Sequence, residues 1–206
     1  MTLVLQEFAT PGASGLTDRS FSPTEERILT SALILIGRRG VRRLGMREIA
    51  ETADVSRGTL YRYFPSKEHV LAAAAAYDGQ RFTDGLDAAL AVERAPARRI
   101  SAFMSYSFEF IRTHPCRPLF ESEPGFVMSY LLDNLPALRD ELVRHLGDAF
   151  DAVPAVAAGT LGKDELADVI ARLFASSWII PETDDASLVQ AVNRILQISS
   201  KETTDE

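Results

Sequence analysis

Apolar side chains recur every three or four residues along most of this chain, a spacing that predicts amphipathic α-helices. We therefore expect an all-α protein with loops near 40–45 and over 153–163. The segments with helical spacing are 23–39, 46–53, 57–64, 67–92, 97–113, 126–132, 136–150, 164–180 and 184–199, with a short helix over 117–123.

The start of the first helix is clearly marked. Ser22 can cap it, Pro23 suits its first position, and Glu25 and Glu26 place acidic side chains in its first turn. Gly40 is typical of a helix end. Before this helix, residues 10–15 are typical of a loop, so we expect residues 1–21 to form a flexible N-terminal arm.

Residues 45–70 predict two short helices joined by a tight turn. The buried faces carry apolar residues at helical spacing: Met46, Ile49, Ala50 and Ala53 in the first helix, Leu60 and Phe64 in the second. Between them, Asp54-Val55-Ser56 breaks the pattern, and the Ser56 hydroxyl can cap the second helix. Pro65 then ends that helix, and Lys67 lies in the first turn of the next.

The outward face of the second short helix carries cations, hydroxyls and phenols, and no acid: Arg57, Thr59, Tyr61, Arg62 and Tyr63. Such donors suit phosphate oxygens and the acceptors on guanine edges. Lys67 is disfavoured near a helix N-terminus unless a bound phosphate offsets the helix dipole. A pair of ordinary bundle helices would not usually present only such donors, so the segment indicates a helix-turn-helix with a recognition helix.

Charge is distributed unevenly along the chain. The whole sequence carries a net charge of −7, but residues 20–70 contain nine Lys/Arg against six Asp/Glu, and the excess acid lies in 71–206. Overall acidity argues against nucleic acid as a partner, whereas this asymmetry favours it for the N-terminal part.

Two stretches, Arg47-Glu48-Ile49-Ala50 and the run from Val55 to Lys67, resemble the DNA-binding domain of TetR-family transcriptional regulators. The specific part of the likeness covers Thr24 to Leu71. It implies a homodimer with an N-terminal three-helix DNA-binding domain and a larger C-terminal helical domain for ligand binding and dimerisation. Gly45 stands where the family often has Thr or Ser, so a hydroxyl contact to phosphate is missing there.

From this likeness we expect residues 22–70 to bind double-stranded operator DNA and 71–206 to bind a small-molecule effector of unknown identity. We expect Arg57 to read bases with the help of Thr59. The residues expected to contact phosphates are Tyr61, Tyr63, Lys67 and Arg47, and Ser56 is a further candidate DNA-binding residue. Arg42 and Arg43 are equally consistent with phosphate contact and with simple solvation. The expected function is a ligand-responsive repressor, released from a pseudo-palindromic operator by a largely apolar molecule.

The 97–113 segment is apolar nearly all round, which predicts a position at the centre of its domain. Candidate effector-binding residues are aromatic: Phe103, Tyr106, Phe110, Phe126 and Trp178. Ser105, Ser107 and Glu109 are candidate polar anchors. A buried glutamate would suit a cationic ligand, and without one an acyl chain or a flat hydrophobe fits as well. In the family the helices near 164–180 and 184–199 form the dimer interface, although their apolar stripes are equally consistent with intramolecular core.

Other classes of function receive little support. His114, Cys116, Glu121 and Glu123 are close in sequence, but their spacing matches no metal motif, and we expect no metal, no cofactor and no catalysis. A helical small-molecule-binding or adaptor protein without DNA binding is the alternative, if the donor face is incidental. The single cysteine, the lack of a long apolar run and the absence of a secretion signal favour a cytoplasmic protein.

Overall fold

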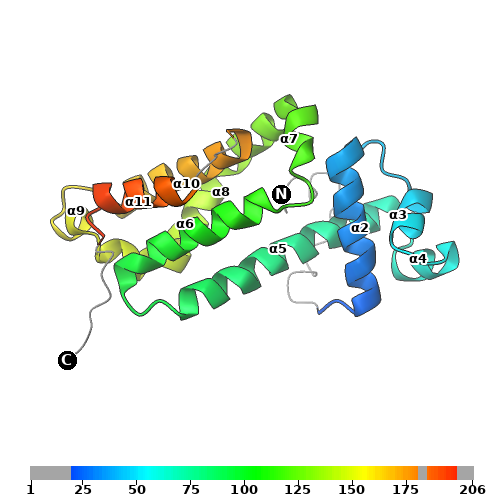
Figure 1. The fold of residues 1–206 in the computed structure, drawn as a ribbon, viewed down its shortest axis with the longest axis horizontal. Coiled ribbons are helices and arrows are strands. Elements are labelled where there is room, and N and C mark those ends of the chain that lie inside the picture. Colours follow the sequence, from blue (N-terminus) through cyan, green and yellow to red (C-terminus); the bar gives the residue numbers. More distant parts are fainter. Residues whose placement is uncertain (1–19, 181–184, 199–206) are drawn as a thin grey trace. The chain divides into compact units, whose positions relative to one another are not determined.

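The computed structural model describes residues 20–180 and 185–198, apart from the side chains of Asp185 and several residues between 120 and 141. Every regular element in this part is a helix (Figure 1). In chain order they are α2 (Pro23–Arg39), α3 (Met46–Thr52), α4 (Arg57–Tyr63), α5 (Lys67–Ala91), α6 (Pro96–Arg112), α7 (Pro118–Ser122), α8 (Pro124–Asp151), α9 (Pro154–Ala157), α10 (Lys163–Ile179) and α11 (Asp185–Ile195).

Helix α2 begins and ends as its sequence predicts. Ser22 and Glu25 form a reciprocal capping box, in which the Glu25 carboxylate accepts the Ser22 amide at 2.9 Å. At the other end Gly40 has a φ of 80°, and its amide donates to the Ile36 carbonyl. Phe21, which the sequence places in the arm, packs edge-on against Tyr77 of α5. Residues 1–19 of that arm lie outside the described residues.

The helices of the predicted helix-turn-helix pack on α2. Helix α3 contacts both α2 and α4, and α7 contacts α2. One core cluster contains Ile28 and Leu33 of α2, Ile49 of α3 and Leu60 of α4, each fully buried. The residues predicted to form the buried faces of the two short helices therefore share one core.

Packing divides the chain into two compact units. The first contains the described residues up to Asp84 together with Thr113–Tyr130, and the second contains Gly85–Arg112 and the described residues from Leu131 onwards. Helices α5 and α8 therefore have residues in both units. The expected division at residue 70, between a DNA-binding domain and an effector-binding domain, stays a prediction.

In the second unit α10 and α11 pack on α6 (Figure 1). The prediction that helix α6 is apolar nearly all round was wrong, because Ser105, Glu109 and Arg112 form an exposed polar stripe. Its opposite face is buried: Ile100, Phe103, Met104, Ser107, Phe108 and Ile111.

Two other predictions of helix ends were wrong. The segments 126–132 and 136–150 belong to one continuous helix, α8, with Pro136 inside it. Proline has a helical φ and removes a single backbone donor, so it does not always end a helix. The expected loop over 153–163 contains the short helix α9, which begins at Pro154.

Candidate nucleic-acid interface

Helix α4 is held by its buried face and presents the rest of its side chains outward. Leu60 is fully buried, whereas Arg57, Tyr61 and Arg62 are exposed. Tyr61 is 50% exposed, a large value for an aromatic side chain on a packed helix. The exposed part of α4 carries no acid, as the sequence predicts.

Ser56 caps α4 as predicted. Its hydroxyl oxygen accepts the Thr59 amide at 3.0 Å and lies 2.9 Å from the Thr59 hydroxyl. Both hydroxyls are therefore engaged within the first turn, although an O–H group retains capacity for a further hydrogen bond. This capped turn defines the start of α4, where Arg57 is exposed.

Tyr63 is less available than Tyr61. Its ring is half-buried against the core cluster, and the Arg62 guanidinium lies 5.2 Å from the ring centroid. A cation over an aromatic face is a favourable contact. Tyr63 therefore contributes to the packing of the recognition helix as well as lying on its predicted donor face.

Arg47 and Arg57 line one hollow of about 310 Å³ between α3 and α4, together with Ala50, Glu51 and Val55. The two guanidinium groups differ in whether an acidic side chain already binds them. Arg47 Nε donates to Glu51 Oε1 at 2.7 Å, and this hydrogen bond and the carboxylate charge raise the pKa of Arg47 further. Arg57 makes no ion pair with any residue that the structure describes.

Lys67, at the start of α5, is held close to the α2–α3 loop. Its Nζ donates to the backbone carbonyl of Arg42 at 3.2 Å. An ammonium group has three donors, so two remain for another acceptor. The preceding Ser66 hydroxyl donates to Glu68 at 2.6 Å, and this hydrogen bond lowers the pKa of Glu68.

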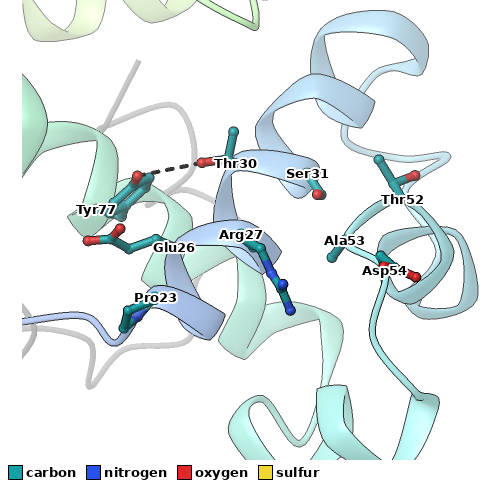
Figure 2. A pocket seen from close by; sticks show the side chains of 9 residues that line it. All are labelled: Pro23, Glu26, Arg27, Thr30, Ser31, Thr52, Ala53, Asp54 and Tyr77. Atoms are coloured by element: carbon teal, nitrogen blue, oxygen red, sulfur yellow. Dashed lines mark hydrogen bonds between the residues drawn. The ribbon is translucent and has the colours of Figure 1, made fainter.

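A second hollow in the first unit is lined by a different set of residues (Figure 2). It measures about 680 Å³ and is lined by α2, the end of α3 and Tyr77, whose hydroxyl lies 3.5 Å from the Thr30 hydroxyl. Its charged groups are mixed, with Glu26, Arg27 and Asp54 all contributing. Such a mixture does not match a polyanion, and no predicted DNA-binding residue lines it.

The first unit contains a buried polar pair that was not predicted from the sequence. His114 Nε2 lies 2.8 Å from Asp78 Oδ1, and the two side chains are 1% and 2% exposed. The Cys116 amide donates to His114 Nδ1 at 3.1 Å, so Nε2 carries the proton that Asp78 accepts. One signal was available: Asp78 falls four residues after Ala74 on the buried stripe of its helix.

Two of the four residues that lie close in sequence near 114–123, His114 and Cys116, make buried structural contacts. His114 binds Asp78, and the Cys116 thiol lies 3.2 Å from the Leu33 carbonyl, where burial raises the pKa of the thiol. The side chain of Glu121 lies outside the described part. Within that part, no group of three potential metal ligands comes together.

The aromatic residues predicted to bind an effector are largely packed against other rings. Phe103 is buried with its ring 6.3 Å from that of Phe174, which meets Trp178 edge-on. Tyr106 and Phe110 are half-buried with ring centroids 6.1 Å apart. The side chain of Phe126, the fifth predicted residue, is outside the described part.

The three candidate polar anchors for the effector differ in burial. Glu109 is exposed and bound to Arg112 at 2.6 Å, and Ser105 is exposed, so neither is an interior anchor as expected. Ser107 is fully buried, and its hydroxyl has no hydrogen-bond partner among the described atoms. Because Glu109 is exposed, it does not supply the buried carboxylate that a cationic effector would need.

Among the helices that the structure describes, none is both long and apolar enough to cross a membrane.

Known proteins resemble the N-terminal part of this chain. The sequence pattern described as "Bacterial regulatory proteins, tetR family" matches residues 28–74. The HTH-type transcriptional repressor KstR of Rhodococcus jostii RHA1 is 44% identical over 73 residues, which are 35% of this chain and 34% of KstR. That match spans about a third of the relative's length.

Some relatives match over a longer stretch. The HTH-type transcriptional regulator RutR of Escherichia coli K12 is 30% identical over 159 residues, 76% of this chain and 70% of RutR. KstR of Mycolicibacterium smegmatis is 29% identical over 154 residues, 75% of this chain and 72% of that protein.

Solved structures share the fold at lower identity. A TetR-like regulator from Rhodococcus sp. RHA1 superposes with a TM-score of 0.59 at 19% identity, covering 87% of this chain and 94% of that one. The ketosteroid transcriptional regulator KstR2 of Mycobacterium tuberculosis gives 0.55 at 19%, covering 86% and 94%.

Proposed function

This chain belongs to the TetR family of bacterial transcriptional regulators, and from that premise we propose how it works. It is a dimeric, cytoplasmic DNA-binding repressor whose two α4 helices read a pseudo-palindromic operator. A small, largely apolar effector releases it. The curated relatives named KstR are transcriptional repressors, which supports repression over activation.

The observation that carries the proposal is the exposed face of α4. Arg57 has no acidic partner among the described residues, and Tyr61 is exposed beside it on a helix whose buried face is fixed by Leu60. An uncompensated guanidinium held in this way can donate two hydrogen bonds to guanine O6 and N7. We assign base reading to Arg57 with Thr59.

Phosphate contacts are assigned to Tyr61, Lys67 and, more weakly, Tyr63 and Arg47. Arg47 would have to share or leave its Glu51 partner before it could bind a phosphate. Ser56 acts by fixing the first turn of α4. Phosphate contacts position the protein without distinguishing sequences.

The dimer interface is assigned to α10 and α11. Each buries one apolar stripe within its own unit, yet Val169 of α10 is 51% exposed and Ile195 of α11 is 77% exposed. A second copy packing on these faces would remove that apolar surface from water. Replacing Val169 with Asp should convert a dimer into a monomer in sedimentation analysis, whereas an unchanged sedimentation coefficient would place the interface elsewhere.

The effector site is assigned to the interior of the C-terminal domain, near Phe103, Tyr106, Phe110, Phe126 and Trp178. With Glu109 at the surface, the interior around α6 offers apolar contacts and the Ser107 hydroxyl. This favours an acyl chain or a flat hydrophobe with at most one hydrogen-bonding group near Ser107. Release follows if effector binding changes the spacing of the two α4 helices, which must fit major grooves roughly 34–36 Å apart.

Selection from a random duplex pool tests the proposal. The full-length protein should enrich a two-fold symmetric sequence with half-sites one helical turn apart. Recovery of no preferred sequence, with weak binding that disappears at moderate salt, would contradict the repressor and favour a helical adaptor or binding protein without an operator.

A further inference from the structure

Four arginines meet around one hollow at the end of α2. Arg38, Arg39, Arg42 and Arg43 line a space of about 420 Å³ together with Ser122 and Glu123. All four arginine side chains are exposed. The arginines come from the last turn of α2 and from the loop that leads into α3 (Figure 1).

The charges in this hollow are poorly compensated. Arg39 forms an ion pair with Glu48 of α3, but Arg38, Arg42 and Arg43 make no ion pair with any described residue. The hollow has a single acidic residue in its lining, Glu123. Like charges gathered at one place repel each other, and an anion bound among them would relieve that repulsion.

Two contacts hold this loop and the end of α2 against α3 and α5. The Arg39–Glu48 pair joins the end of α2 to α3, and the Lys67 ammonium donates to the Arg42 carbonyl at 3.2 Å. The second contact places a third cation beside Arg42 and Arg43. Because Lys67 keeps two donors, it can bind an anion without leaving the loop.

We propose that Arg42 and Arg43, together with Lys67, bind the DNA phosphate backbone beside the groove that α4 enters. This proposal rests on the proposed function, and it adds a second contact region to the recognition helix. Several exposed cations spread along a loop match successive phosphates of a polyanion better than they match one enclosed small anion. The shared chemistry is a phosphate oxygen, and DNA is the source to which we assign it.

Salt dependence provides the direct test. The full-length protein and its Arg42→Gln and Arg43→Gln variants are titrated with the selected operator and with a random duplex over a series of salt concentrations. Each phosphate contact contributes about 0.9 to the slope of log K against log salt, so each variant should lower the slope by about 1.8 for a dimer. The affinity should fall alike on both duplexes.

A matched control removes the same charge elsewhere. Arg94 is exposed in the connection between α5 and α6 and makes no ion pair with the described residues. Arg94→Gln should leave the slope at the wild-type value. Arg43→Lys should also keep it, because a lysine at that position retains the charge, and all variants should unfold at the wild-type temperature.

Ethylation interference locates the contact. Phosphates beside each half-site should be sensitive to ethylation with the wild-type protein and insensitive with Arg43→Gln. Wild-type slopes in both Gln variants would overturn the proposal and leave the repressor standing. Binding of inorganic pyrophosphate that is lost in these variants, with unchanged DNA slopes, would assign the hollow to a free phosphate compound and equally overturn it. Failure of the wild-type protein to bind any duplex would remove both the proposed function and this inference.

Discussion

Helices α4 and α6 use their side chains in opposite ways. In α4 the buried face is Leu60, and two of the residues expected to act on DNA, Arg57 and Tyr61, are exposed to solvent. In α6 the residues expected to bind an effector, Phe103 above all, are themselves part of the packing. Function is therefore separable from stability on α4 and inseparable from it on α6, where one aromatic ring can serve as core, as pocket wall or as both.

The largest expected effect tests the α6 side of this comparison. Phe103→Ala should lower the free energy of unfolding by about 3–5 kcal/mol, because it leaves a cavity beside Phe174. Urea unfolding followed by the fluorescence of Trp178, the only tryptophan in the sequence, measures it. Unchanged stability together with lost effector binding would make Phe103 a pocket residue and break the contrast with α4.

Two neighbours on α4 test the other side. Leu60→Ala should lower the free energy of unfolding by about 2–5 kcal/mol, since Leu60 is fully buried. Tyr61→Ala should change it by no more than about 0.5 kcal/mol, because half of that side chain is exposed. Thermal unfolding and operator affinity are measured together: Tyr61→Ala should weaken DNA binding without the loss of stability. Comparable destabilisation by both changes would show that the two roles are not separable on α4 either.

A smaller effect is expected at the cap of α4. Ser56→Ala removes the acceptor for the Thr59 amide and should cost about 1 kcal/mol in the free energy of unfolding. Ser105→Ala is the matched change on the exposed face of α6 and should be nearly neutral. If operator affinity falls while stability stays at the wild-type value, Ser56 contacts DNA directly instead of acting through the helix.

Much of the first unit could be predicted because its signals are local. Ser22, Gly40 and Ser56 mark helix ends by their own backbone chemistry, and Leu60 repeats the spacing of a buried face. The exposed donor face of α4 could be predicted for the same reason. The seven consecutive residues of this helix contain cations, a hydroxyl and phenols, and no acid.

Features that depend on distant partners could not be predicted. The Asp78–His114 pair joins residues that are 36 positions apart, and the sequence around one residue does not identify the other as its partner. Pro136 was predicted to begin a helix because proline suits the first helical position, whereas it lies inside the continuous helix α8. Glu109 and Ser107 lie on opposite faces of α6, and only the position of α10 and α11 decides which face is interior.

In the proposed complex α4 reads the DNA sequence through Arg57, while Lys67 binds the phosphate backbone. The most direct measurement compares the affinities of Arg57→Ala, Lys67→Ala and the wild-type protein for the selected operator, for its single-base variants and for random duplex. Arg57→Ala should lose about 1–3 kcal/mol of operator binding and discriminate poorly at one base pair in each half-site, while Lys67→Ala should weaken all duplexes alike. Equal losses on operator and random duplex for Arg57→Ala would contradict the claim.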